Sequence, residues 1–178
     1  MFFRKNESTI IRNLLHFHKI ESRSIMTPRT VVKAAAEEMT LQAFYDANRK
    51  LQFSRIPTYH EGSKDRVTGF FLKDELLASL LEGEGDKPLS SLRRDIMIIK
   101  EDLAITDLYD QLLEKREHIA LVVDEFGGMA GIVTMEDVIE TLLGLEIVDE
   151  FDKTVDMQTL ARENWKKRAK KLGLDEPD

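Results

Sequence analysis

The sequence predicts an α/β fold made of two copies of a β-α-β-β-α unit, with a further helix at each end of the chain. Two observations predict it. Short apolar runs with strand periodicity and longer runs with helical periodicity follow one another in the same order twice. The 178 residues are 42% apolar, which is enough for two small repeats that share a core.

The first unit is expected between residues 30 and 81. Its elements, in chain order, are expected as a strand at Val31-Val32, a helix that begins after Thr40, strands at Arg55–Tyr59 and Val67–Leu72, and a helix from Lys73 to Leu81. Thr40 belongs to the residue types that cap helix N-termini. Pro57 has no backbone N–H, so its strand is expected at an edge of the sheet, or Pro57 at the end of the strand.

The second unit repeats this order after a turn-rich linker at residues 82–88. Its elements are expected as a strand at Ile96–Ile99, a helix capped by Thr106, strands at Ile119–Val123 and Met129–Val133, and a helix that ends at about Leu143. Residues 124–128 join the last two strands, and the glycines among them suit a hairpin loop.

The two units align with each other. Tyr45-Asp46 corresponds to Tyr109-Asp110 in the first helix, and Gly69 corresponds to Gly131 in the last strand. The interval between these positions is two residues shorter in the second unit, and the hairpin loop accounts for the difference. Repetition of both order and spacing supports this fold more strongly than any single motif does.

The segments outside the two units have the pattern of helices. Apolar residues recur at helical spacing from about Asn6 to Lys19, and again in a tail that is rich in lysine and arginine. The predicted organisation is therefore an N-terminal linker helix (1–24), a first repeat (25–84), a second repeat (85–150) and a C-terminal basic amphipathic helix (151–178).

Composition excludes several classes of protein. The chain has no cysteine, which rules out zinc–thiolate sites and thiol catalysis, and its net charge of −7 argues against a nucleic-acid-binding surface. The sequence contains no run of about 18 apolar residues that would span a membrane. Its histidines are scattered and no nucleophile–base motif is present, so neither a metal site nor a catalytic residue is predicted.

The segment Gly131–Asp137 carries the clearest signal for a site. It has the pattern of a strand that leads directly into a helix, with the hydroxyl of Thr134 and the carboxylate of Asp137 on the first turn. This spacing is that of a capping box, which is a structural role. The same geometry lets a carboxylate accept hydrogen bonds from both hydroxyls of a ribose. These residues alone leave both interpretations open.

The repeated unit and its motifs resemble a tandem CBS-domain pair, also called a Bateman module. Within that superfamily, the chain is similar to the cytoplasmic CBS pair of CorC/CNNM-type proteins, which are membrane proteins linked to magnesium and cobalt efflux and often described as haemolysin-like. The resemblance covers about residues 6–150, and its motifs are Ile25-Met26-Thr27-Pro28-Arg29, Ser54-Arg55-Ile56-Pro57, Asp124-Glu125-Phe126-Gly127-Gly128 and Gly131–Glu140.

The resemblance implies a site for an adenine nucleotide, either ATP with Mg²⁺ or AMP, in the cleft between the repeats. It implies that Thr134 and Asp137 hold the ribose and that Ile132 lines the adenine pocket. Thr27 would contribute to the cleft from the N-terminal side. Arg55 would face the phosphates, a role that suits the planar fork of donors in a guanidinium group.

The first repeat departs from this pattern. The positions that match Thr134 and Asp137 are Leu72 and Glu75. A leucine side chain offers no hydrogen bond, and glutamate is one methylene longer than aspartate. One occupied nucleotide site per chain is therefore predicted.

By the same resemblance, the chain is expected to be a non-catalytic regulatory module that forms a homodimer. It would control an attached N-terminal transmembrane transport domain that this chain lacks. The full-length protein would place the module at the cytoplasmic face of the inner membrane, and this fragment would be soluble. The alternative is a ligand-free scaffold that dimerises a membrane partner, in which Thr134 and Asp137 only cap a helix.

Overall fold

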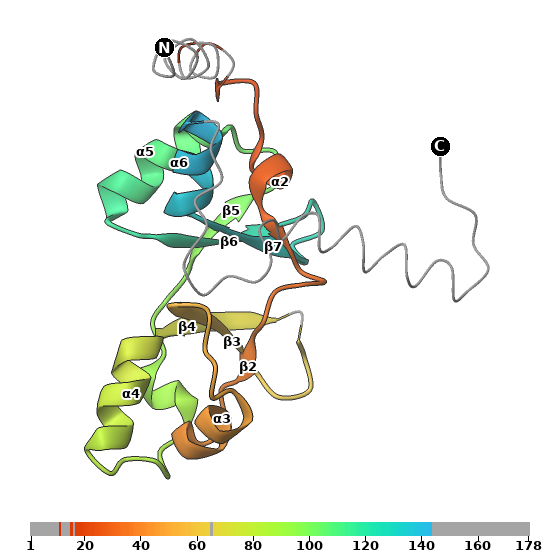
Figure 1. Cartoon of the computed structure of the whole chain (residues 1–178). Coiled ribbons are helices and arrows are strands. Elements are labelled where there is room, and N and C mark those ends of the chain that lie inside the picture. Colours follow the sequence, from red (N-terminus) through yellow and green to blue (C-terminus); the bar gives the residue numbers. More distant parts are fainter. Residues whose placement is uncertain (1–10, 12–14, 16, 65, 144–178) are drawn as a thin grey trace, which may run out of the picture.

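Two β-sheets lie face to face at the centre of the molecule, and helices cover the outer face of each sheet (Figure 1). The computed structural model describes residues 11, 15, 17–64 and 66–143. The chain passes from one sheet to the other through two connections, at residues 29–34 and at residues 93–96 (Figure 1). This arrangement confirms the predicted α/β fold of two repeats.

The first repeat forms a three-stranded sheet in the order β2-β3-β4. Its elements are β2 (Ala35–Ala36), α3 (Leu41–Ala47), β3 (Arg55–Tyr59), β4 (Val67–Leu72), α4 (Lys73–Leu81) and the 3₁₀ helix η1 (Leu89–Leu92). β2 runs parallel to β3, and β3 runs antiparallel to β4. Thr40 caps α3 as predicted, because its hydroxyl accepts a hydrogen bond from the backbone N–H of Ala43 at 3.2 Å.

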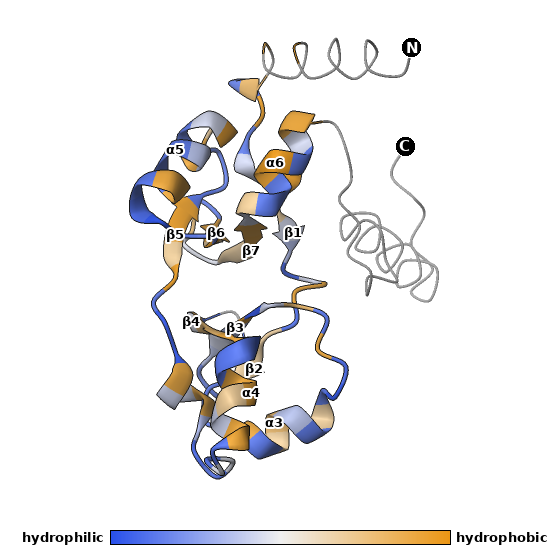
Figure 2. Ribbon diagram, turned by 60° about the vertical axis from the view of Figure 1, so that its left-hand side comes forward, coloured by the Kyte–Doolittle hydropathy of each residue, from blue (hydrophilic) through white to orange (hydrophobic). Residues whose placement is uncertain are grey.

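The second repeat forms a four-stranded sheet in the order β1-β7-β6-β5. Its elements are α2 (Ser22–Ile25), β1 (Thr27–Pro28), β5 (Met97–Lys100), α5 (Ile105–Lys115), β6 (Ile119–Val123), β7 (Met129–Thr134) and α6 (Met135–Leu143). β5 runs parallel to β6, and the remaining pairs are antiparallel. Figure 2 shows apolar residues in β7 and along α6, which packs on this sheet.

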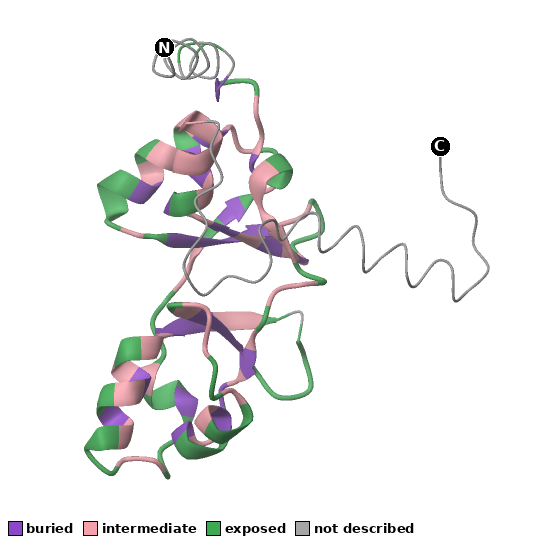
Figure 3. Ribbon diagram, viewed as in Figure 1, coloured by how far each residue is buried: buried purple, intermediate pink, exposed green. Residues whose placement is uncertain are grey.

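Each repeat has its own hydrophobic core between sheet and helices. Strand β6 shows that one face of a sheet packs against helices and the other face packs against the other repeat. Ala120 and Val122 belong to the core beneath α5 and α6, whereas Ile119 and Leu121 are buried without belonging to either core. Since alternate residues of a strand point to opposite faces, Ile119 and Leu121 face the first repeat. Buried residues accordingly lie both in the facing strands and on the helices that cover them (Figure 3).

Each repeat also pairs with the segment of chain that leads into the other repeat. β1 pairs with β7, with Thr27 opposite Ile132, and Arg94 forms an isolated bridge with Phe70 of β4. Glycine is required at both contacts. A Cβ atom at Gly131 would lie 2.3 Å from the carbonyl oxygen of Thr27, and one at Gly69 would lie 2.2 Å from that of Arg94. The aligned glycines therefore serve the same close approach of two backbones.

Three local predictions were wrong, each for a different structural reason. Val31 and Val32 form a turn in which both backbone N–H groups point to the carbonyl of Pro28, and the strand begins only at Ala35. Thr106 does not cap α5. The helix begins at Ile105, whose N–H donates to the carbonyl of Ile20 at 3.0 Å.

The third wrong prediction concerns Pro57. Its strand, β3, is the central strand of its sheet and not an edge. β2 pairs only with Thr58 and Tyr59, so Pro57 has no strand neighbour on that side. A missing backbone N–H is tolerated there because no ladder hydrogen bond is lost.

The ends of the chain fall mostly outside the described residues. Of the predicted helix at residues 6–19, the described residues Ile11, Leu15 and Phe17 are helical. The predicted tail helix at 151–178 lies outside the described part. The predicted boundary between residues 24 and 25 does not coincide with a change of sheet, because α2 and β1 both contact the second sheet. In the described part of the chain, no helix has the length and apolar character needed to cross a membrane.

Candidate functional site

The junction between β7 and α6 places Thr134 and Asp137 in direct contact. The backbone N–H of Thr134 donates to Asp137 Oδ2 at 2.6 Å, and the Thr134 hydroxyl donates to the same oxygen at 2.8 Å. The N–H of Asp137 returns a weaker bond to Thr134 Oγ1 at 3.3 Å. The capping box is thus formed. Both bonds that Thr134 donates end on Oδ2, and no described residue donates a hydrogen bond to Oδ1.

The Asp137 carboxyl lies in a position that disfavours its charge. Burial raises its pKa from 3.8 to about 6, and the hydrogen bonds from Thr134 offset only part of that effect. The nearby carboxylates of Glu140 and Glu136 raise the pKa further. A partly buried acid with a raised pKa at the end of a strand is a candidate for a functional site.

Thr27 and Ile132 lie beside this junction and face the first repeat. Ile132 pairs with Thr27 on one side and with Leu121 on the other. Directly opposed residues of antiparallel strands point to the same face of the sheet. Since Leu121 faces the first repeat, Thr27 and Ile132 do so too. The structure therefore brings four of the five predicted residues to one corner of the sheet interface.

Arg55 lies in the other repeat. It is the first residue of β3 and lies opposite Leu72 at the end of β4. Among the described residues, no hydrogen bond or ion pair joins Arg55 to Thr27, Thr134 or Asp137. Its predicted role toward phosphates remains a prediction.

The corresponding junction of the first repeat, between β4 and α4, has different chemistry. Leu72 provides no side-chain cap for α4. Glu75 accepts hydrogen bonds from Arg94, whose Nε lies 3.3 Å from Oε2 and whose Nη2 contacts Oε1. Arg94 bridges to Phe70 just as Thr27 pairs with Ile132. The guanidinium of Arg94 therefore engages the carboxylate that corresponds to Asp137.

Sequence reasoning did not identify Arg94 as part of this comparison. Arg94 corresponds to Thr27 because each pairs with the equivalent position of the last strand of a repeat, in β4 and β7. The sequences around Arg94 and Thr27 do not resemble each other. Arg93 and Arg94 stand next to each other in the sequence, but that pair by itself is typical of an exposed linker. Only the paired backbones show that one of these arginines reaches the first junction.

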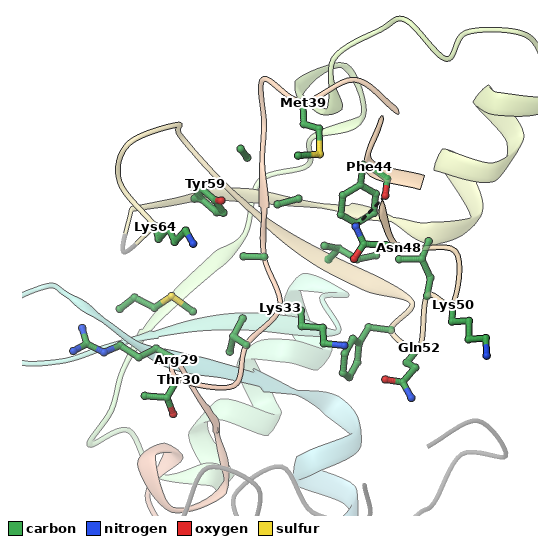
Figure 4. Close-up of a pocket in the computed structure, with 18 residues that line it drawn as sticks. Arg29, Thr30, Lys33, Met39, Phe44, Asn48, Lys50, Gln52, Tyr59 and Lys64 are labelled. Carbon is green, nitrogen blue, oxygen red and sulfur yellow. Dashed lines mark hydrogen bonds between the residues drawn. The ribbon is translucent and has the colours of Figure 1, made fainter. Parts of the chain in front are cut away.

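A cavity of about 590 Å³ lies beside the residues of the predicted site (Figure 4). Arg29 and Thr30 follow β1, Phe53 and Ile56 flank Arg55, and Met129 belongs to β7. The described residues that line the cavity include no acidic side chain, and they include four cationic ones, Arg29, Lys33, Lys50 and Lys64.

One of these cations stacks on an aromatic ring. The Nζ atom of Lys33 lies 5.9 Å from the centre of the Phe53 ring. Sequence reasoning missed this cavity because residues 29–36 and 48–53 show no shared pattern and meet only in the folded chain. A positive cavity with apolar walls in a protein of net charge −7 suits an anionic ligand with an apolar or aromatic part.

Comparisons with known proteins agree with this architecture. The CBS domain family model matches residues 89–144. A UPF0053 protein of Synechocystis sp. is 37% identical over 169 residues, which are 95% of this chain and 48% of that protein. The magnesium and cobalt efflux protein CorC of Escherichia coli strain K12 is 31% identical over 149 residues, which are 83% of this chain and 50% of CorC. The chain spans about half the length of these curated relatives.

A solved structure extends the agreement to three dimensions. It is the CBS domain of the bacterial CNNM/CorC family Mg²⁺ transporter in complex with ATP, with a TM-score of 0.73 and 34% sequence identity. The match covers 78% of this chain and 98% of that chain. By sequence and by fold, this chain therefore belongs to the CBS domains of the CNNM/CorC family.

Proposed function

We propose that this chain is a regulatory module that binds one adenine nucleotide at the β7–α6 junction, between the two repeats. The hydrogen bonding of Asp137 is the observation that carries the proposal. Its Oδ2 atom is held by Thr134, which leaves Oδ1 for the hydroxyls of a ribose. Ile132 and Thr27, on the same face, would contact the adenine and its surroundings.

The bound ATP of the related CBS domain supports the choice of ligand class. The charge of the neighbouring cavity supports it as well. Arg55 and the cations of the cavity would attract phosphates, which an acidic chain would otherwise repel. The proposed ligand is either ATP with Mg²⁺ or AMP, and the titration described below compares the two.

The first junction supports a stoichiometry of one. Arg94 already satisfies the Glu75 carboxylate, and Leu72 offers no hydrogen bond. A nucleotide at that junction would have to displace the chain's own guanidinium. We therefore expect a single nucleotide per chain.

The regulatory part of the proposal concerns the longer relatives. CorC is named as a magnesium and cobalt efflux protein, and this chain corresponds to half of it. We propose that the module acts as a homodimer at the cytoplasmic face of a membrane and has no catalytic role. A nucleotide could then alter transport by an attached domain only if it bound one arrangement of the repeats more tightly than another.

The test is calorimetric titration of the purified chain with ATP·Mg²⁺, AMP and adenosine. Asp137→Asn should weaken binding at least ~100-fold, because it removes the carboxylate that the ribose requires and keeps a side chain of similar size. Glu75→Gln is the matched control, since it changes the corresponding residue of the other repeat, and it should leave affinity nearly unchanged. Arg55→Ala should weaken ATP binding more than adenosine binding.

The same titration distinguishes the alternative. If the chain is a ligand-free scaffold, none of the three ligands binds at millimolar concentration and Asp137→Asn alters only stability. Equal loss of binding in the Asp137 and Glu75 variants would contradict the single-site proposal. Thermal unfolding gives an independent measure, since a ligand at 100 times its Kd stabilises the folded state by about 2.7 kcal/mol.

A further inference from the structure

Two glutamates and a histidine meet at the end of the first sheet, away from the β7–α6 junction. Glu37 and Glu38 follow β2, and His60 follows β3. The two strands are parallel, with Ala36 opposite Tyr59, and the N–H of Glu37 continues the ladder to the carbonyl of Tyr59 at 2.9 Å. Because parallel strands end at the same edge of a sheet, the register itself brings these three side chains together.

The donor atoms of the three side chains converge. His60 Nδ1 lies 3.3 Å from Glu37 Oε1 and 2.5 Å from Glu38 Oε1. One ligand atom from each residue lies within 4.8 Å of the other two. In a metal site with bonds of about 2.0–2.2 Å to nitrogen and oxygen, neighbouring ligand atoms are roughly 3 Å apart. The three ligand atoms therefore lie close enough that small side-chain movements would let one ion contact all of them.

A second layer of hydrogen bonds orients both carboxylates. Glu37 Oε2 accepts from the hydroxyl of Thr68 at 2.7 Å and from Nη1 of Arg93 at 2.9 Å, which leaves Oε1 directed at His60. The backbone N–H of Glu61 donates to both oxygens of Glu38, at 3.2 and 3.1 Å. Fixed outer partners of this kind orient the ligands of metal sites.

The burial and the exposure of the cluster also suit an ion. The buried Glu37 carboxylate is held in place by the hydroxyl of Thr68 and the guanidinium of Arg93. The side chains of Glu37, Glu38 and His60 are 11%, 36% and 64% exposed. The inner carboxylate is thus fixed, while the outer side of the cluster is open to an entering ion and to water ligands.

We propose that Glu37, Glu38 and His60 bind a divalent transition-metal ion, with water completing its coordination. One imidazole nitrogen and two carboxylate oxygens favour ions such as Co²⁺ or Zn²⁺ over Mg²⁺, which prefers oxygen ligands and binds imidazole poorly. The site uses no residue of the nucleotide site, so it does not depend on the proposed function. A simple ion pair, in which a protonated His60 links two carboxylates, is the competing explanation.

The test is titration of the full chain, freed of metal with a chelator, with Co²⁺ and Zn²⁺. Bound Co²⁺ is followed by its visible absorption, and Zn²⁺ by calorimetry. We expect one ion per chain, a loss of affinity of at least ~10-fold in His60→Ala and in Glu38→Gln, and no competition from an equal concentration of Mg²⁺. Failure of the wild-type chain to bind either ion at ~1 mM would overturn the proposal and leave the ion pair.

Three controls make the result specific. His118→Ala changes an exposed histidine of the other repeat and should bind Co²⁺ as the wild type does. Asp137→Asn should also bind Co²⁺ normally, and loss of Co²⁺ binding in that variant would show that the ion sits at the nucleotide site instead. Circular dichroism of His60→Ala and Glu38→Gln checks their folding. A folded His60→Ala variant with undiminished affinity would refute the assignment.

Discussion

The two strand-to-helix junctions, β4–α4 and β7–α6, share a backbone layout and differ in what satisfies the acid on the first helical turn. At the second junction, Asp137 is held through Oδ2 by Thr134 of its own junction, and no described residue donates to its other carboxylate oxygen. At the first junction, Glu75 is satisfied by Arg94, from the chain segment that crosses to the second repeat. Under the proposed function, the second junction binds the ligand, while the protein's own Arg94 occupies the first.

This difference arises from side chains alone. Both junctions use a glycine to admit a crossing segment, at Gly69 and at Gly131, and both crossing segments pair with the strand two residues before the helix-capping position. What changes is the residue on the crossing segment: Thr27 in one case and Arg94 in the other. The same backbone layout therefore carries different side-chain chemistry at its two junctions.

Replacement of either glycine by alanine should give the largest effect on stability. At both positions the added Cβ would meet a backbone oxygen, which cannot move aside without breaking a strand pair. We expect Gly69→Ala and Gly131→Ala each to cost about 3 kcal/mol or more of unfolding free energy, measured by chemical denaturation. Gly62→Ala is the control, because its positive φ of 86° adds only backbone strain of about 1 kcal/mol and no atom lies within 4 Å. If only one of the two junction variants lost stability to this extent, the two junctions would not depend equally on a close approach of backbones.

The ionisation of Asp137 should give the next largest effect, a dependence of the unfolding free energy on pH. Its pKa is about 6 in the folded chain against an ordinary 3.8, so between these values the folded chain holds a proton that the unfolded chain has released. Stability therefore falls as the pH rises from about 4 to about 6, by on the order of 3 kcal/mol. Asp137→Asn should remove this fall, and denaturation curves at pH 4, 5, 6 and 7 measure it. Glu75→Gln should leave it in place.

Nucleotide affinity should also depend on the ionisation of Asp137. Ribose hydroxyls donate to the ionised carboxylate, so the ligand favours the charged form of Asp137. We expect affinity to rise with pH up to about 6 and then to level off, with a proton released on binding below that pH. Calorimetry in buffers of different ionisation enthalpy counts that proton. An affinity that is constant from pH 5 to pH 7 would place the ribose away from Asp137.

The smallest effect should come from the Arg94–Glu75 pair. The two side chains are 51% and 37% exposed, so solvent screens their attraction. A double-mutant cycle with Arg94→Ala and Glu75→Ala should give a coupling energy below about 1 kcal/mol that decreases in high salt. A coupling of several kcal/mol would mean that the pair holds the repeats together and does more than occupy the first junction.

Much of the fold could be predicted from local pattern. The boundaries of β3, β4, α4 and β6 match the predicted ranges, because in each the apolar period and the flanking turn residues agree. The prediction was wrong at Val31, where a local turn onto Pro28 replaces the strand. It was also wrong at Thr106, where the first N–H of the helix bonds to the distant Ile20, and at Pro57, where pairing with the neighbouring strand begins only at Thr58. Propensity describes only a residue's near neighbours, so it is weakest where strand pairing crosses between repeats.

The sequence by itself determined that the chain contains two similar units, and that only the second carries a threonine and an aspartate at the start of its last helix. Periodicity and spacing are local properties, so they can be recognised from the order of residues alone. Only the tertiary structure decided that Arg94 reaches Glu75, that Lys33 and Phe53 line one cavity, and that Glu37, Glu38 and His60 converge. Those contacts depend on which strands lie side by side, and strand neighbours are fixed by packing of the whole chain.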